Sequence, residues 1–240
     1  MDALAIGLST QRALAQSVDT IAYNLANAST TGFRATAERF ERKSRMADGV
    51  PVDMVQSQAG ALERASGSLT KTDNPLDVAV SQDRWLGVQT QAGVGYTKDG
   101  RLKIAESGML MTSMDLPVVD ESGAPIMVNP AGGPLLIRQN GVVLQDGAEA
   151  GRIGLFSLPP EANLQRLSPL VVWTESPADA GGEGREASLQ QGFLETSNVN
   201  PMAELTKLIT AQRFFSGTTT LIEACEASFN DAIKTLSATG

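Results

Sequence analysis

The C-terminal stretch from Asn200 to Gly240 carries a seven-residue apolar repeat, which limits the folds available to the whole sequence. One position of the repeat is apolar each time, at Leu208, Phe215, Ile222, Phe229 and Leu236. Three-and-four spacing sustained over this length predicts a long α-helix that packs along a seam. Asn200 supplies a capping side chain and Pro201 suits the first helical position, so we expect the helix to begin there.

A neighbouring row of the same helix is apolar at its two ends and polar between them, at Gln212, Thr219 and Glu226. Polar side chains inside a seam destabilise an isolated two-stranded coiled coil. We therefore expect several helices to share this surface. An ordinary two-helix core is the alternative.

A second helical pattern occupies the N-terminal end of the chain. Its three-and-four spacing runs through Leu4, Leu8, Gln11, Leu14, Val18, Ile21 and Leu25. Because both ends carry helical seams, we predict that the two long helices pair antiparallel as a coiled-coil-like domain. One pair leaves the outer helix faces uncovered, so the pattern also points to contacts with further copies.

Short apolar runs and turn signals replace the helical pattern in the centre of the chain. The turns are marked by pairs such as Asp99-Gly100, Asn140-Gly141 and Asp146-Gly147, and we predict a hairpin from Gly95 to Ile104 about the first of them. The predicted fold class is therefore α+β with a central all-β domain. Its segments are an N-terminal helix (1–32), an extended connector (33–68), the β domain (69–190) and a C-terminal helix (191–240).

The composition argues against most catalytic and binding classes. The chain has no histidine and a single cysteine, Cys225, so the usual catalytic triads and zinc sites cannot be built. A net charge of -8 disfavours nucleic acid as a partner, and no apolar run is long enough to span a membrane. We expect no enzyme activity, no metal and no cofactor. A carboxylate-dependent hydrolase and a secreted β-domain binding module are the alternatives.

A local basic run follows the first helix and contains Arg34, Arg39, Arg42, Lys43 and Arg45. Such a run is usually a solvated face. In an acidic chain it could equally meet acidic residues of a neighbouring copy, for which Glu204, Glu223 and Glu226 are candidates.

The end of the first helix carries an ordered motif rather than a simple cap. Residues 23–33 read Tyr-Asn-Leu-Ala-Asn-Ala-Ser-Thr-Thr-Gly-Phe, with Gly32 as a helix stop and Phe33 as an apolar anchor. This string resembles the signature of the bacterial flagellar rod and hook protein family. Further motifs similar to that family follow in the same order, at residues 74–80, 82–86, 95–100 and 192–201. Arg84-Trp85-Leu86 is more similar to proximal than to distal rod members, which remain the close alternative.

This resemblance implies a structural function. Members of the family pack their terminal helices into a tube around an export channel, place a β domain outside it, and transmit torque through the periplasmic rod. The implied partners are copies of this chain, other rod proteins and the flagellar type III export apparatus, with peptidoglycan or surrounding rings as further candidates. The residues expected at the subunit interface are Leu4, Leu14, Val18, Ile21, Leu25, Asn27, Phe33, Leu208, Phe215, Ile222, Phe229 and Leu236.

Overall fold

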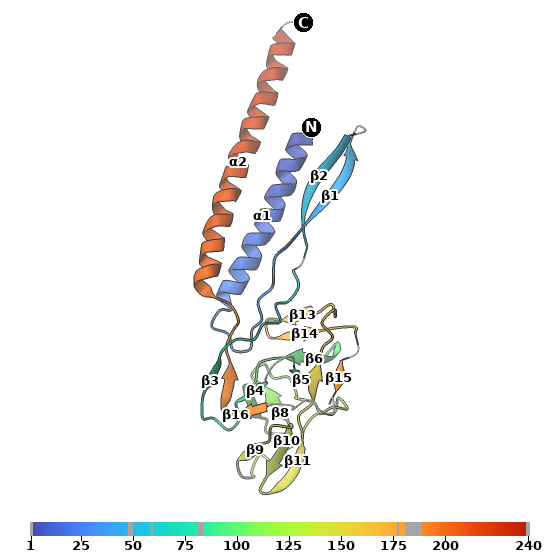
Figure 1. The fold of residues 1–240 in the computed structure, drawn as a ribbon, viewed down its shortest axis with the longest axis vertical. Coiled ribbons are helices and arrows are strands. Elements are labelled where there is room, and N and C mark those ends of the chain that lie inside the picture. Colours follow the sequence, from blue (N-terminus) through green and yellow to red (C-terminus); the bar gives the residue numbers. More distant parts are fainter. Residues whose placement is uncertain are drawn as a thin grey trace. The chain divides into compact units, whose positions relative to one another are not determined.

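The computed structural model describes residues 2–47, 50–58, 60–80, 84–176, 178–180 and 189–238 (Figure 1). Gln82 and Asp83, from one of the motifs above, lie outside these ranges. Leu4, Phe229 and Leu236 lie on helices, but their side chains are not among those described. The chain divides into two compact units: a helical unit of Met1–Ala26, Thr36–Ala61 and Asn200–Gly240, and a β unit of Asn27–Ala35 and Leu62–Val199.

The helical unit contains two antiparallel helices and one hairpin. Helix α1 (Asp2–Ala26) packs against α2 (Pro201–Ala238) and also against strand β2 (Val50–Gln58), which pairs with β1 (Arg39–Ala47). At 1.5 Å per residue the 38 residues of α2 span about 57 Å. In Figure 1 its C-terminal end therefore continues beyond the start of α1. The predicted α+β class with paired terminal helices is confirmed.

The hairpin lies in the segment expected to be an extended connector, residues 33–68. Sequence periodicity does not reveal β1, because charged residues occupy successive positions along it rather than alternating with apolar ones. An isolated two-stranded hairpin is marginally stable in water. The packing of β2 beside α1 supplies the missing stabilisation, and this tertiary contact cannot be read from the local sequence.

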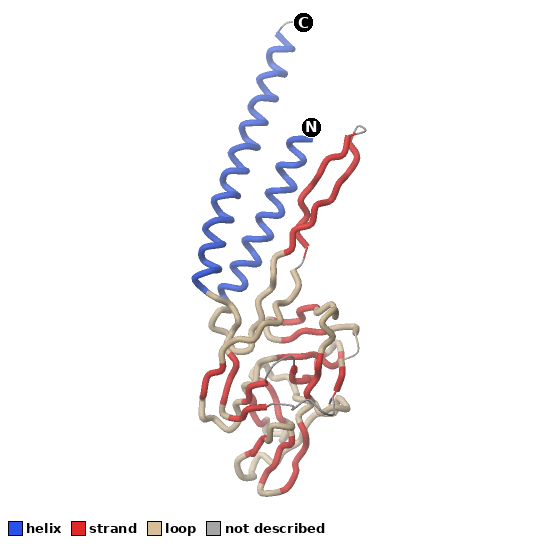
Figure 2. The backbone as a smooth tube through the Cα atoms, in the orientation of Figure 1, coloured by secondary structure: helices blue, strands red, loops and turns tan. Residues whose placement is uncertain are grey.

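The β unit is built from short antiparallel strands (Figure 2). Its largest sheet has the strand order β13-β14-β6-β5-β12-β15, and smaller groups are β11-β10-β9, β16-β4, β17-β3 and β7-β8. The strands are β3 (Leu69–Lys71), β4 (Val78–Val80), β5 (Arg84–Thr90), β6 (Gly93–Thr97), β7 (Leu102–Ile104), β8 (Leu110–Thr112), β9 (Leu135–Ile137), β10 (Val142–Gln145), β11 (Ala148–Arg152), β12 (Leu155–Ser157), β13 (Gln165–Ser168), β14 (Val171–Trp173), β15 (Asp179–Ala180), β16 (Leu189–Gln191) and β17 (Phe193–Glu195).

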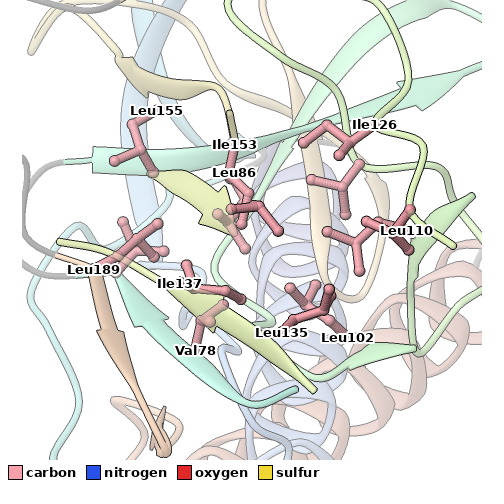
Figure 3. Close-up of a cluster of buried hydrophobic side chains, with 14 residues drawn as sticks. Val78, Leu86, Leu102, Leu110, Ile126, Leu135, Ile137, Ile153, Leu155 and Leu189 are labelled. Carbon is pink, nitrogen blue, oxygen red and sulfur yellow. The ribbon is translucent and has the colours of Figure 1, made fainter. Parts of the chain in front are cut away.

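The core of the β unit is aliphatic and draws on strands far apart in the sequence. Figure 3 shows side chains such as Leu86, Leu110 and Ile153 gathered in one cluster, which Leu189 joins from β16. A second cluster contains the edge-to-face pair of Tyr96 and Phe156, whose ring centres lie 5.4 Å apart. Burial raises the pKa of Tyr96.

Two of the three predicted turns form hairpins. Strands β9 and β10 flank Asn140-Gly141, and β10 and β11 flank Asp146-Gly147. Both residues of the latter pair have positive φ, 51° and 84°, as a type I′ turn requires. The predicted hairpin about Asp99-Gly100 is wrong, because β6 pairs with β5 and β14 while β7 pairs with β8.

The Asp99 side chain explains this difference. Its carboxylate accepts hydrogen bonds from Arg101 Nε at 2.8 Å, Arg101 Nη2 at 3.0 Å and the Ser113 hydroxyl at 2.5 Å. The hydrogen bond to Asp99 raises the pKa of Arg101, against the effect of burial. At Gly100 an added Cβ would lie 1.6 Å from the carbonyl oxygen of Val78. The Asp-Gly pair thus provides a buried carboxylate for Arg101 and Ser113 and a close backbone approach, not a hairpin turn.

A core substitution tests the packing of the β unit. Leu110 is fully buried, so Leu110→Ala is expected to lower the free energy of unfolding by about 2–5 kcal/mol. Both tryptophans, Trp85 and Trp173, belong to this unit, so their fluorescence during urea titration of the full chain reports its unfolding.

The matched control is Leu136→Ala, at a leucine that is 55% exposed, where a change of about 0.5 kcal/mol or less is expected. Equal effects of the two substitutions would contradict the core assignment.

Candidate assembly surface

The two helices meet along the predicted seam. An added Cβ at Gly7 would lie 3.0 Å from Ile222 Cγ1, and Gln11 Nε2 donates a hydrogen bond to Thr219 Oγ1 at 3.2 Å. The later residue of α1, Gln11, thus contacts the earlier residue of α2, as an antiparallel pair requires. The Gln11–Thr219 contact also gives one of the polar seam residues a partner inside the chain.

The predicted interface residues have different surroundings. Ile21 and Phe33 are fully buried. Seven are half-buried: Leu14, Val18, Leu25, Asn27, Leu208, Phe215 and Ile222. Asn27 and Phe33 belong to the β unit rather than to the helix pair. Asn27 Oδ1 accepts a hydrogen bond from the Thr30 hydroxyl at 3.2 Å, so it stabilises the turn after α1.

Another flank of α1 is buried by polar contacts within the helical unit. The Ser17 hydroxyl donates to Glu38 Oε1 at 2.5 Å. The Asn24 side chain donates to the carbonyl oxygen of Thr36 and accepts from its backbone N–H, both at 3.0 Å. These bonds attach the chain that leads into β1 to the side of α1, and Asn24 acts as a clamp on the backbone.

Large apolar side chains remain exposed on α2 outside the row that begins at Leu208. They are Met202, Leu205, Ile209, Phe214 and Leu221. Phe214 and Leu221 lie outside the predicted heptad rows, although their seven-residue separation defines a further row. Contiguous exposed apolar surface commonly marks a protein interaction site.

A groove runs between the two helices beside the seam. It has a volume of about 390 Å³ and is lined by Ala15, Val18, Asp19, Gln212, Phe215 and Ser216. Val18 and Phe215 are half-buried and give the groove an apolar part, while the exposed Asp19 contributes a carboxylate. The groove can therefore accommodate an apolar side chain beside a cationic one.

The motif after α1 meets the motif before α2 inside the β unit. Gly32 donates its N–H to the carbonyl oxygen of Glu195 at 2.8 Å, and Arg34 Nη2 donates to Glu195 Oε1 at 2.7 Å. Lys98 Nζ lies 4.0 Å from Glu195 Oε2. Arg34, Lys98 and Glu195 are each no more than 2% exposed, so three separate sequence motifs converge in one buried ionic cluster.

Backbone contacts complete this junction. Gly32 has φ of 70°, and an added Cβ would lie 2.5 Å from the backbone of Lys98 and Asp99. Asn198 Oδ1 accepts a hydrogen bond from the Ala35 N–H at 2.7 Å, and its Nδ2 donates to the carbonyl oxygen of Ala65 at 3.0 Å. The glycine and the asparagine of the two motifs thus hold neighbouring chain segments together.

Two expectations about charged residues are corrected. Arg34 is not part of a solvated basic face, because its guanidinium is buried against Glu195. Glu204 is also buried and pairs with Lys207 at 2.6 Å, so it is not a freely exposed acid. Glu223 and Glu226 are exposed.

The described parts of the chain contain neither a metal-binding cluster nor a helix that could span a membrane. No three Cys, Asp or Glu side chains there lie close enough to hold a metal ion. None of the helices seen in those ranges has the length and apolarity needed to cross a membrane.

Comparison with known proteins gives consistent matches. The family model of the flagella basal body rod protein covers residues 4–34, and that of the flagellar basal body rod FlgEFG protein C-terminal covers residues 190–235. The chain is 39% identical to the flagellar basal-body rod protein FlgF of Mesorhizobium japonicum over 98% of both chains. FlgF of Rhizobium meliloti is 33% identical over 97% of both chains. FlgG of Bacillus subtilis is 25% identical over 95% of this chain and 96% of its own length.

The buried ionic cluster generates a stability prediction. Glu195→Gln keeps the side-chain shape but leaves the Arg34 and Lys98 charges buried without their carboxylate. Removing one partner of such a pair costs about 3–5 kcal/mol, and tryptophan fluorescence during urea unfolding measures this loss.

The control is Asp73→Asn, which breaks the exposed Lys71–Asp73 pair, where a change of about 0–1 kcal/mol is expected. If both variants unfold at the same urea concentration as the wild-type chain, the cluster does not stabilise the β unit.

Proposed function

This chain belongs to the family of flagellar basal-body rod proteins, and we propose that it polymerises into the proximal rod, where it encloses the export channel and transmits torque. Its place is the basal-body rod, and its role there is structural. The greater identity to FlgF than to FlgG supports a proximal position. We assign it no catalytic role.

One structural observation carries the assembly proposal. Helix α2 exposes large apolar side chains that α1 does not cover, although α1 already packs along the seam. Burying such side chains between copies is favourable because apolar surface leaves water. Heterologous contacts repeated along a rise build a helical filament. The helices within residues 1–32 and 191–240 would form the inner domain of that filament, and the β domain of residues 69–190 its outer part.

The proposed interface includes the seam side chains that remain half-buried in the monomer, among them Val18, Leu208, Phe215 and Ile222. Leu4, Phe229 and Leu236 extend the same rows toward the helix ends and belong to this proposal by their sequence positions. Neighbours in the rod would be copies of this chain and other rod proteins. Delivery by the flagellar type III apparatus and contact with peptidoglycan or the surrounding rings complete the proposal.

The test uses a strain that lacks the gene and is complemented with variants. Wild-type protein should be present in isolated basal bodies by immunoblot. Ile222→Asp is expected to reduce incorporation at least about tenfold, because a carboxylate would be placed in the apolar helix seam. Unchanged tryptophan fluorescence would show that the β unit still folds.

The control Leu136→Asp adds the same charge at an exposed position of β9 and should leave incorporation unchanged. Absence of the wild-type protein from basal bodies would refute the rod function. Normal incorporation of Ile222→Asp would refute the role of the seam in assembly but not the rod function.

A further inference from the structure

The groove and two exposed apolar residues, Phe214 and Leu221, lie on opposite flanks of α2. Successive residues of an α-helix are about 100° apart. Counted from Phe215, which faces α1, Gln212 and Ser216 therefore lie to one side and line the groove. Phe214 and Leu221 lie to the other side and are 63% and 68% exposed.

This arrangement determines the kind of contact that can fill the groove. A helix pair cannot place Phe214 into its own groove, because the two are on opposite sides of α2. In a two-fold dimer the same surface meets itself, whereas two different surfaces meet head-to-tail in an open assembly. A projecting side chain on one flank and a groove on the other are the components of such a head-to-tail contact.

We propose that Phe214 of one copy inserts into the α1–α2 groove of the next copy. The inference rests on the proposed assembly function. It specifies the two surfaces that meet, with one copy providing Phe214 and the next copy providing the groove. The half-buried Phe215 and Val18 would contact the inserted ring. Apolar side chains anchored in a pocket commonly dominate the affinity of an interface.

Charge complementarity supports a second copy as the occupant. Asp19 lines the groove, and Arg213 is adjacent to Phe214. Both are exposed, and neither forms an ion pair with another described residue. When Phe214 enters the groove of the next copy, Arg213 is brought toward Asp19 of that copy. Opposite charges placed in this way fix the register of an interface.

Charge reversal tests the contact and identifies the occupant. Asp19→Lys and Arg213→Glu each place like charges together and should lower incorporation into basal bodies at least about tenfold. The double variant restores the opposite charges between copies and should recover most of the incorporation. Glu106→Lys makes the same charge change as Asp19→Lys on an exposed residue of the β unit and should have no effect.

Each other outcome contradicts the inference. If the double variant incorporates no better than the weaker single variant, the partner of this surface is a different rod protein. If both single variants incorporate normally, the groove is not an interface. In either case wild-type protein in the basal bodies would leave the rod function intact.

Disulfide trapping provides an independent readout. Asp19→Cys with Arg213→Cys, in a Cys225→Ser background, should give a ladder of multiples of 25.2 kDa on oxidation of assembled basal bodies. Each single-cysteine variant should remain monomeric, because a head-to-tail contact does not bring equivalent residues together. A dimer from a single-cysteine variant would indicate a two-fold contact and overturn the proposal, as would the absence of a ladder in the assembled double variant.

Discussion

The buried ion pair between Arg34 and Glu195 is the interaction on which the connection between the chain's two ends depends. Arg34 follows α1 in the sequence, and Glu195 ends the last strand before α2. Their contact at 2.7 Å, with Lys98 near the same carboxylate, ties both connecting segments to the β unit. Burying these charges is unfavourable unless they are paired. The pair therefore specifies one arrangement of the segments, since a shifted register would leave a charge buried alone.

This dependence gives the short motifs a physical meaning. Gly32 must be glycine because its φ is positive and the Lys98–Asp99 backbone passes against it. Gly67 donates its N–H to Glu195 Oε1 at 2.9 Å, and an added Cβ there would lie 2.0 Å from the Thr196 carbonyl oxygen. The Asn198 side chain forms hydrogen bonds with the backbone of two separate segments, at Ala35 and at Ala65. The motifs are thus separate parts of one junction.

The sequence predicts the features that depend on local pattern. Long helices at both ends follow from heptad spacing, and the turn at Asp146-Gly147 follows from residues that tolerate positive φ. Features that depend on distant partners were missed. The local sequence of Arg34 is typical of a surface arginine, but in the fold Arg34 pairs with the distant Glu195. The local sequence of Asp99 is typical of a turn, but its carboxylate binds Arg101 and Ser113. The hairpin of β1 and β2 was missed because α1 provides its support. Within the candidate interface, the heptad pattern does not single out Phe214. It identifies the row that packs against α1, whereas Phe214 lies on a different row that stays exposed.

The helical unit combines a stable contact with surfaces that the monomer cannot cover. Gln11 donates a hydrogen bond to Thr219 within the helix pair, whereas Gln212 lines the groove and Glu226 is exposed. A fully apolar seam would favour a closed two-helix core, because all of its surface could be buried at once. Here the seam is partly polar, and apolar side chains on both flanks of α2 remain exposed after α1 has packed. Contact with a different neighbour on each flank would bury more of this surface, as the proposed open helical assembly requires.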